Sequence, residues 1–135
     1  MSKLFEKFQI KGINFRNRIV MSPMCQYSAK DGYATNWHLV HYGSRAVGGA
    51  GLIITESVGI SPEGRISPGD LGIYHADHVI KLKEITNFIK ENGGVPGIQL
   101  AHAGRKASAQ IFQEWKGDGS VDEQEGGWQP VAPSP

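Results

Sequence analysis

Residues 18–27 read Arg18-Ile19-Val20-Met21-Ser22-Pro23-Met24-Cys25-Gln26-Tyr27. The apolar run 19–21 predicts a buried strand, and the run breaks at Pro23, whose ring fixes φ and which has no N–H to give to a sheet. A thiol at Cys25 and a phenol at Tyr27 follow directly. This pattern is typical of the C-terminal edge of a parallel α/β sheet, where ligands bind. The alternative is an ordinary buried cysteine after a proline turn, since free cysteines are among the most buried residues.

Length and composition narrow the class of protein. A chain of 135 residues suits one domain. A net charge of +1 argues against a nucleic-acid binder that neutralises phosphates. No apolar run reaches the roughly 18 residues of a membrane helix, so no membrane partner is expected. The single cysteine excludes an internal disulfide framework, and the first residues lack an apolar signal core, so we expect a cytoplasmic protein.

Hydrophobic periodicity and glycine positions predict alternating strands and helices. The predicted elements are a hairpin at 8–15 turning at Lys11-Gly12, strands at 18–21, 52–55 and 96–100, helices at 37–47 and 77–91, and long loops at 59–76 and 107–135. Thr35 or Asn36 caps the first helix, and Gly48-Gly49 ends it. Buried strands that alternate with helices over residues 18–100 predict a parallel sheet with right-handed crossovers.

Three parallel strands do not close a fold. Their sheet has open edges and one face without helices, whereas a (β/α)₈ barrel needs about 250 residues. We therefore expect an α/β chain that forms the N-terminal portion of a (β/α)₈ TIM barrel, a single incomplete domain over residues 1–135. The stop in a loop at Pro135 suggests a truncation or one piece of a split protein.

Polar side chains follow all three predicted strands, at Ser22–Tyr27, at Glu56-Ser57 and at Gln99–Arg105. In a parallel barrel these segments meet on one rim, and that rim carries the active site. The amide of Gln99 donates and accepts hydrogen bonds at once, as a flat heterocycle with mixed edges requires. The alternative for Gln99 is a polar residue of a barrel layer that bonds its neighbours.

Other polar residues allow two interpretations each. Glu56 is either an acid/base or a structural carboxylate. His38, His41 and His102 are either metal ligands or packing and capping groups. The pair Arg105-Lys106 either contacts an anion or lies at the surface. No glycine-rich dinucleotide motif follows a strand, and there is no Walker loop.

Several motifs together resemble the Old Yellow Enzyme family. They are Ser22–Tyr27, His41–Ala46, Gly51–Glu56, Gly64–Ile66 and Gly97–Lys106. Cys25 and Tyr27 match the xenobiotic-reductase, or thermophilic-like, branch of that family. The resemblance implies an FMN-dependent NAD(P)H oxidoreductase on a (β/α)₈ barrel, with the hairpin closing the barrel's N-terminal end. Such an ene-reductase or NADPH dehydrogenase passes hydride from NADPH or NADH through FMN to the activated C=C bond of an enone or nitro compound.

The resemblance also implies roles for individual residues. The implied flavin-lining residues are Ser22, Pro23, Met24, Cys25, Ser57 and Gln99. Cys25 lies near the reactive side of the flavin and tunes its redox behaviour, Ser57 contacts the flavin through its backbone, and Gln99 bonds the pyrimidine edge. Tyr27 reaches the activating carbonyl of the substrate, so Cys25 and Tyr27 are the expected catalytic pair.

The resemblance covers only somewhat over a third of the family's barrel. The family's substrate-anion pair, proton-donating tyrosine and flavin-phosphate loops lie outside it, so we expect these 135 residues alone to bind FMN poorly and to show no turnover. One alternative is a non-catalytic fragment that pairs its open edges with a complementary half or with itself as a homo-oligomer. Another is a metal-dependent hydrolase that uses His38, His41 and His102.

Overall fold

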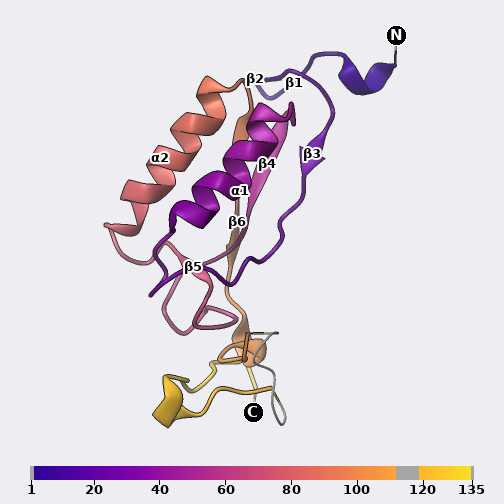
Figure 1. Cartoon of the computed structure of the whole chain (residues 1–135). Helices are drawn as coiled ribbons and strands as arrows, with labels where there is room; N and C mark the ends of the chain where they lie inside the picture. The colour runs from indigo at the N-terminus through magenta and orange to yellow at the C-terminus, as the bar shows by residue number, and fades with distance from the viewer. Residues whose placement is uncertain (1, 112–118, 135) are drawn as a thin grey trace.

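The computed structural model describes residues 2–111 and 119–134 and consists of a small parallel sheet, two α-helices and an N-terminal hairpin (Figure 1). The elements are β1 Phe8–Ile10, β2 Ile13–Phe15, β3 Val20–Met21, α1 Asn36–Val47, β4 Leu52–Gly59, β5 Leu71–Gly72, α2 His78–Glu91 and β6 Val95–Ala101, with 3₁₀ turns at Lys3–Phe5, Gly104–Lys106 and Glu123–Glu125.

β4 is the central strand of the sheet. β3 pairs with it at Val20↔Leu52 and β6 pairs with it on the opposite edge from Leu52↔Val95 onward, both in parallel. β5 pairs with the last residues of β4, on the same edge as β3, because β6 occupies the other edge there. The predicted parallel sheet is therefore confirmed, and β5 is a short strand inside the segment that was expected to be a loop.

The predicted hairpin is confirmed, with Ile10 paired to Ile13 across the turn. Lys11 and Gly12 both have positive φ, at 46° and 83°, which is the backbone of the tight turns that suit the twist of a hairpin. The rings of Phe8 and Phe15 stack with their centroids 4.8 Å apart. This hairpin is the two-stranded sheet that precedes β3 in the chain.

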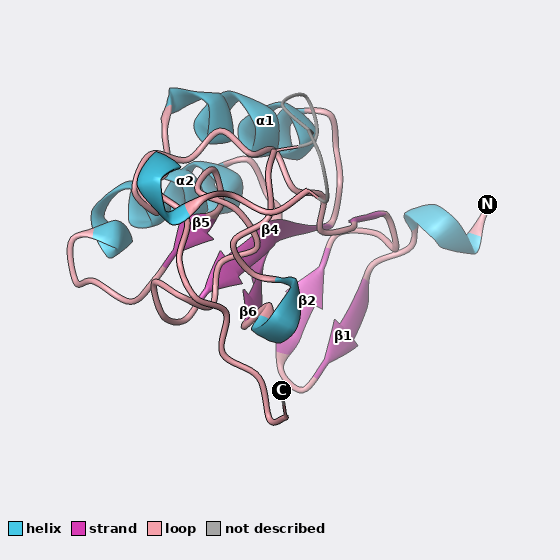
Figure 2. Ribbon diagram, turned by 90° about the horizontal axis from the view of Figure 1, so that it is seen from below, coloured by secondary structure: helices cyan, strands magenta, loops and turns pink. Residues whose placement is uncertain are grey.

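The two helices begin and end close to the predicted residues, and both cover the same face of the sheet (Figures 1 and 2). Thr35 caps α1, and Gly49 follows its end with a φ of 100°. The apolar sides of the helices meet the sheet in two hydrophobic clusters. The larger one consists of Met21, Tyr42, Ala46, Ala50, Ile53, Ile85 and Ile89, and the smaller one of Ala29, Val58, Leu71 and Leu82. Among the described residues no helix has the length and apolar character to cross a membrane.

Two details of the predicted strands are wrong. The expected buried strand at 18–21 is reduced to Val20–Met21, and only Met21 of that pair is buried, while Val20 is 50% exposed. Side chains alternate along a strand, so Met21 faces the helices together with its partner Ile53, whereas Val20 points to the opposite face. The second strand does not end at residue 55 but continues to Gly59, which places Glu56 and Ser57 inside it.

The segment from residue 107 is irregular, as expected, where the structure describes it. A bridge joins Ala109 to Ser120, and the Trp128 indole donates a hydrogen bond to the Glu63 carbonyl at 2.9 Å. Residues 112–118 and 135 of the predicted loop lie outside the described residues.

Candidate functional site

An extra residue in β4 decides which way Glu56 and Ser57 point. Ile54 pairs with Gly97 and Ser57 pairs with Gln99, so β4 advances three residues where β6 advances two. Such a bulge shifts the alternation of side chains along one strand. Beyond the bulge, Val58 packs in the core beneath the helices with Leu71 and Leu82. Glu56 therefore points to the helix side, and Ser57 points to the opposite face of the sheet with Gln99.

The thiol of Cys25 lies beside Ser57. It faces the backbone N–H of Ser57 and the hydroxyl of Tyr27, and it is partly buried. Since Ser57 is the register partner of Gln99, the structure brings Cys25, Ser57 and Gln99 together at the C-terminal ends of β3, β4 and β6. Burial raises the pKa of the Cys25 thiol, and the nearby carboxylates of Asp70 and Glu56 raise it further. At neutral pH the thiol is therefore a neutral hydrogen-bonding group and not a thiolate nucleophile.

Tyr27 is held in an unusual backbone conformation. Its φ is 51°, in the left-handed region that bulky residues rarely adopt. Its carbonyl group packs so closely on Gly69 that a Cβ at residue 69 would lie 2.8 Å from the carbonyl oxygen. Burial is the main cause that raises the pKa of the Tyr27 phenol. The hydroxyl therefore stays protonated over the physiological range and is available as a hydrogen-bond donor.

A second buried carboxylate, Asp70, holds the loop that supports Tyr27. It is almost fully buried, and it accepts hydrogen bonds from the Ile66 N–H at 2.7 Å and the Ser67 hydroxyl at 3.0 Å. The Gly69 carbonyl beside it accepts a hydrogen bond from the Ala29 N–H at 2.9 Å. The turn at 66–70 is thereby fixed against the segment that follows Cys25.

Glu56 has the contacts of a structural carboxylate. It is fully buried, and both of its oxygens are occupied. Oε1 accepts a hydrogen bond from the Tyr42 hydroxyl at 2.9 Å and lies 3.1 Å from Nε2 of His38, while Oε2 accepts one from the Gln26 N–H at 2.6 Å. Of the two interpretations from the sequence, these contacts support the structural carboxylate and not a solvent-accessible acid/base.

The remaining candidates from the sequence lie nearer the surface. Ser22 and Met24 are exposed and Pro23 is partly buried. Gln99 is exposed, and its amide makes no hydrogen bond within the described residues. A free amide that can donate and accept, on the same face as the Cys25 thiol, fits the mixed polar edge of a flavin ring. The residues that are present therefore suit an FMN ring laid across this face.

The histidines occupy different places. Nδ1 of His38 accepts a hydrogen bond from the Thr35 N–H at 2.9 Å, so His38 caps α1. His41 is buried one turn later in α1, and His102 follows β6 with its ring against Gly64. Over residues 2–111 and 119–134 no group of three His, Cys, Asp or Glu side chains is arranged to hold a metal ion.

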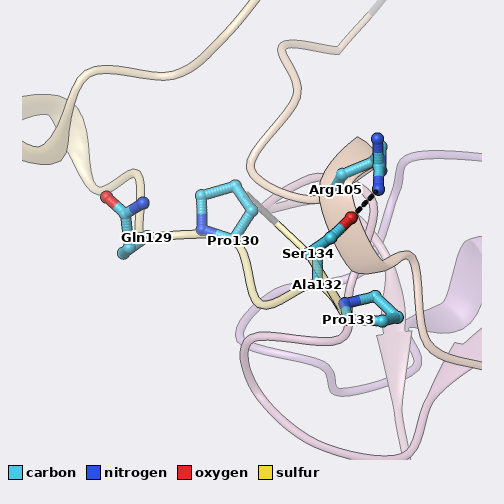
Figure 3. A pocket seen from close by; sticks show the side chains of 6 residues that line it. All are labelled: Arg105, Gln129, Pro130, Ala132, Pro133 and Ser134. Carbon is cyan, nitrogen blue, oxygen red and sulfur yellow. Dashed lines mark hydrogen bonds between the residues drawn. The ribbon is translucent and has the colours of Figure 1, made fainter.

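Arg105 borders an open pocket of about 370 Å³ near the C-terminal end of the chain (Figure 3). The other lining residues are Gln129, Pro130, Ala132, Pro133 and Ser134. Its guanidinium donates to the Ser134 hydroxyl at 3.2 Å, and both Arg105 and Lys106 are exposed. The pair thus has the surface position that the sequence left open as one alternative.

Sequence reasoning missed Tyr42, Asp70 and the bulge in β4. Tyr42 looked like one more member of the apolar stripe of α1, although its hydroxyl bonds Glu56. Asp70 closes the turn Ser67-Pro68-Gly69-Asp70, and an acidic residue there was the available signal for a buried turn carboxylate. The bulge leaves no mark in the sequence pattern, because the residues within it and after it, 55–59, are all buried.

Comparison with known proteins gives consistent matches. The model of the NADH:flavin oxidoreductase / NADH oxidase family matches residues 3–130. The chain is 53% identical over 106 residues to an NADPH dehydrogenase of Geobacillus thermodenitrificans, covering 77% of this chain and 31% of that protein. It is 51% identical over 108 residues to an NADPH dehydrogenase of Bacillus cytotoxicus, again covering 31% of that protein.

Solved structures agree with the fold. An Old Yellow Enzyme homologue from Zymomonas mobilis matches with a TM-score of 0.79 at 32% identity, over 98% of this chain and 33% of that chain. Morphinone reductase matches with a TM-score of 0.76 at 31% identity, over 97% of this chain and 31% of that chain. The chain therefore spans about a third of the length of the proteins it matches, and its fold corresponds to the N-terminal portion of their barrel.

Proposed function

Because the chain belongs to the NADH:flavin oxidoreductase / NADH oxidase family, we propose that it supplies the N-terminal third of an FMN-dependent NAD(P)H oxidoreductase. The proposed reaction is the reduction of an activated C=C bond in an enone or nitro compound. The observation that supports the proposal most is the gathering of Cys25, Ser57 and Gln99 at the ends of three parallel strands. A flat ring placed there meets a neutral thiol and a free amide on one face.

Each residue has a role that its surroundings allow. Gln99 binds the polar edge of the ring through its amide, and the backbone of Ser57 and the segment Ser22–Cys25 line the ring. Cys25 stays protonated because its pKa is raised by burial, so its thiol influences the cofactor as a hydrogen-bonding group without reacting with it. The hydroxyl of Tyr27 donates a hydrogen bond to the activating oxygen of the substrate, where negative charge develops, and keeps its proton. Bound FMN supplies the hydride transfer between NAD(P)H and the substrate.

The activity itself is proposed for a complete barrel. The 135 residues alone are proposed to bind FMN poorly, since the residues gathered here offer one rim of a site and no described group that holds the phosphate. A cytoplasmic location and a homo-oligomeric state belong to the same proposal. They rest on the lone cysteine, which is typical of a reducing compartment, and on the outer edge of β6, which has no strand partner among residues 2–111 and 119–134.

A non-catalytic role in association is the second candidate. Among the described residues β6 pairs only with β4. On the helix side of β6, Leu100 is 60% exposed, and Ile98 lines an open groove of about 390 Å³ with Val79 and Leu82 of α2. These apolar groups support association with a complementary part of a barrel or with a second copy.

A chimera separates the two candidates. In it, the matching segment of the Geobacillus thermodenitrificans NADPH dehydrogenase is replaced by this chain. We expect the chimera to bind FMN, to oxidise NADPH and to reduce cyclohexenone or a nitroalkene, while the 135-residue chain with added FMN shows no turnover. The relative itself serves as the control for the assay. A chimera that folds, as judged by circular dichroism, but binds no FMN would contradict the proposed function and favour association.

A further inference from the structure

We propose that Glu56 is a positioning residue, whose buried carboxylate holds the backbone between Cys25 and Tyr27 and thereby fixes both side chains at the rim. The contribution of this role to catalysis rests on the proposed function. The claim that Glu56 holds the loop does not rest on it, because that claim concerns only contacts within the chain. Glu56 itself touches neither the thiol face nor the open side of the sheet, since the bulge turns it toward the helices.

The central contact is made by Oε2 of Glu56. It accepts the Gln26 N–H at 2.6 Å, and Gln26 is the residue between Cys25 and Tyr27. Hydrogen bonds to a charged acceptor are shorter and stronger than neutral ones. The next residue in β4 is Ser57, whose own N–H faces the Cys25 thiol. Two consecutive residues of one strand therefore hold two consecutive residues of the loop, one through a side chain and one through the backbone.

The helix α1 fixes the other end of the carboxylate. The Tyr42 hydroxyl donates to Oε1 at 2.9 Å and accepts the Glu56 N–H at 3.0 Å, so Tyr42 grips both the side chain and the backbone of Glu56. Nε2 of His38 lies 3.1 Å from Oε1 without the geometry of a hydrogen bond. The Tyr42 hydroxyl on Oε1 and the Gln26 N–H on Oε2 therefore give each oxygen one donor, which leaves the carboxylate little freedom to rotate.

The loop needs such an anchor. Tyr27 has a φ of 51°, a conformation that costs free energy for a bulky residue and persists only when its surroundings impose it. The Gln26 side chain adds hydrogen bonds to the Met24 carbonyl and from the Trp37 indole, but both are at exposed positions. The bond from the Gln26 N–H to Glu56 ties the middle of this turn to a fully buried side chain, and the Ser57 N–H that faces the Cys25 thiol adds a second tie one residue earlier.

The single cysteine offers a direct measurement on the 135-residue chain, without flavin. Cys25 is the only thiol, so its alkylation by iodoacetamide reports how well the loop is held. In Glu56→Gln, an amide NH₂ replaces one acceptor oxygen and opposes either the Gln26 N–H or the Tyr42 hydroxyl. Because the loop then loses its hydrogen bond to a charged acceptor, we expect iodoacetamide to alkylate Cys25 at least about tenfold faster than in the unchanged chain.

The pH profile distinguishes positioning from a change of charge. The ionisable groups that raise the pKa of Cys25 are Asp70 and Glu56, and the Tyr27 hydroxyl also faces its thiol. Removing the Glu56 charge lowers the pKa of the thiol and moves the profile to lower pH, and because a thiolate of lower pKa is a weaker nucleophile, it slightly lowers the limiting rate of the full thiolate. A released loop raises that limiting rate. A rise in the limiting rate is therefore the expected result, and an unchanged or lower limiting rate would overturn the proposal.

Two controls separate the loop from the whole fold. Ile89→Val removes one buried methyl group of the same core and leaves every contact of Glu56 in place. Glu84→Gln changes an exposed carboxylate of α2 that pairs with Lys81. Alkylation in both should stay close to that of the unchanged chain. If Ile89→Val, at equal loss of stability, accelerates alkylation as much as Glu56→Gln, Glu56 contributes only to stability and the proposal fails.

Hydrogen exchange gives an independent test if Glu56→Gln does not fold. In the unchanged chain the Gln26 amide should exchange as slowly as the amides of β4, and Tyr42→Phe should accelerate that exchange. Exchange of the Gln26 amide at the rate of an exposed loop would overturn the proposal. If the loop is held by Glu56 but the chimera binds no FMN, the positioning role stands and only the proposed function fails.

Discussion

Ser57 and Gln99 are register partners in the parallel pairing of β4 with β6, yet Ser57 is buried and Gln99 is exposed. The difference arises because Cys25 lies against Ser57, whereas the amide of Gln99 is left open on the same face of the sheet. The Cys25 thiol and the Gln99 amide, which has no hydrogen bond within the described part of the chain, therefore lie on either side of one register pair of the sheet. This relationship allows the proposed site to be tested one residue at a time.

The Gln99 amide should contribute to flavin binding in the chimera described above. Gln99→Leu keeps a similar volume and removes both the donor and the acceptor, so we expect the Kd for FMN to rise about tenfold. Fluorescence titration with FMN measures this change. Gln9→Leu, on the exposed face of the hairpin strand β1, is the matched control and should leave the Kd unchanged. Equal Kd values for Gln99→Leu and the parent chimera would remove Gln99 from the site.

Tyr27 should affect the reaction and not the cofactor. Tyr27→Phe keeps the ring in its left-handed backbone position and removes only the hydroxyl. We expect kcat/KM for cyclohexenone to fall about tenfold or more in the chimera, because one donor to the developing negative charge is lost. The Kd for FMN should not change. A variant that loses FMN and activity together would instead indicate that Tyr27 supports the cofactor.

The periodic parts of this chain were predictable from the sequence alone. The apolar stripe of α1, a cap at Thr35 or Asn36 and the glycine stop predicted a helix within one residue of the observed start, and the structure shows Thr35 as the cap. The Lys11-Gly12 turn predicted the hairpin, because a tight turn needs positive φ and glycine accepts it readily. In both cases residues close together in the sequence determine the element, so the sequence alone identifies it.

The parts that depend on distant residues were not predictable in the same way. Val20 looked buried, but whether its face of the sheet is covered depends on packing that its neighbours in sequence do not determine. Glu56 looked like the end of a strand, and only the register of β4 against β6 shows the bulge that turns it inward. The partners of Glu56, Tyr42 and Gln26, are separated from it in sequence, so no local pattern identifies the network.

Arg16 should be important for stability, because it ties the hairpin to the ends of both helices. Its guanidinium donates to the carbonyls of Ala46 at 2.6 Å, Ala50 at 2.8 Å and Asn92 at 2.7 Å. A cation at helix C-termini also interacts favourably with the helix dipoles. We expect Arg16→Ala to lower the free energy of unfolding by about 2–3 kcal/mol in urea titrations.

Two variants check the origin of that effect. Arg16→Lys keeps the charge but loses the planar fork of donors, so it should recover only part of the lost stability. Arg18→Ala removes an exposed arginine that bonds the carbonyls of Lys3 and Glu6, and it should cost well under half as much. Equal losses for Arg16→Ala and Arg18→Ala would contradict the role given to the three partly buried carbonyl contacts of Arg16.

Asp70 should make stability depend on pH in a direction opposite to that of an ordinary salt-bridged carboxylate. Burial raises the pKa of Asp70 above its usual value near 3.8, so the folded chain holds this proton more tightly than the unfolded chain does. The contribution of Asp70 to stability is then greatest below its unfolded pKa near 3.8 and is lost as the pH rises through the folded pKa.

The variant Asp70→Asn tests this, because it has no titrating group at residue 70. The stability of the unchanged chain relative to this variant should fall between acid and neutral pH. Urea titrations of both proteins at each pH measure the difference, in which ionisable groups that do not interact with Asp70 cancel. A difference that grows toward neutral pH would mean that the hydrogen bonds from Ile66 and Ser67 outweigh the burial of the charge.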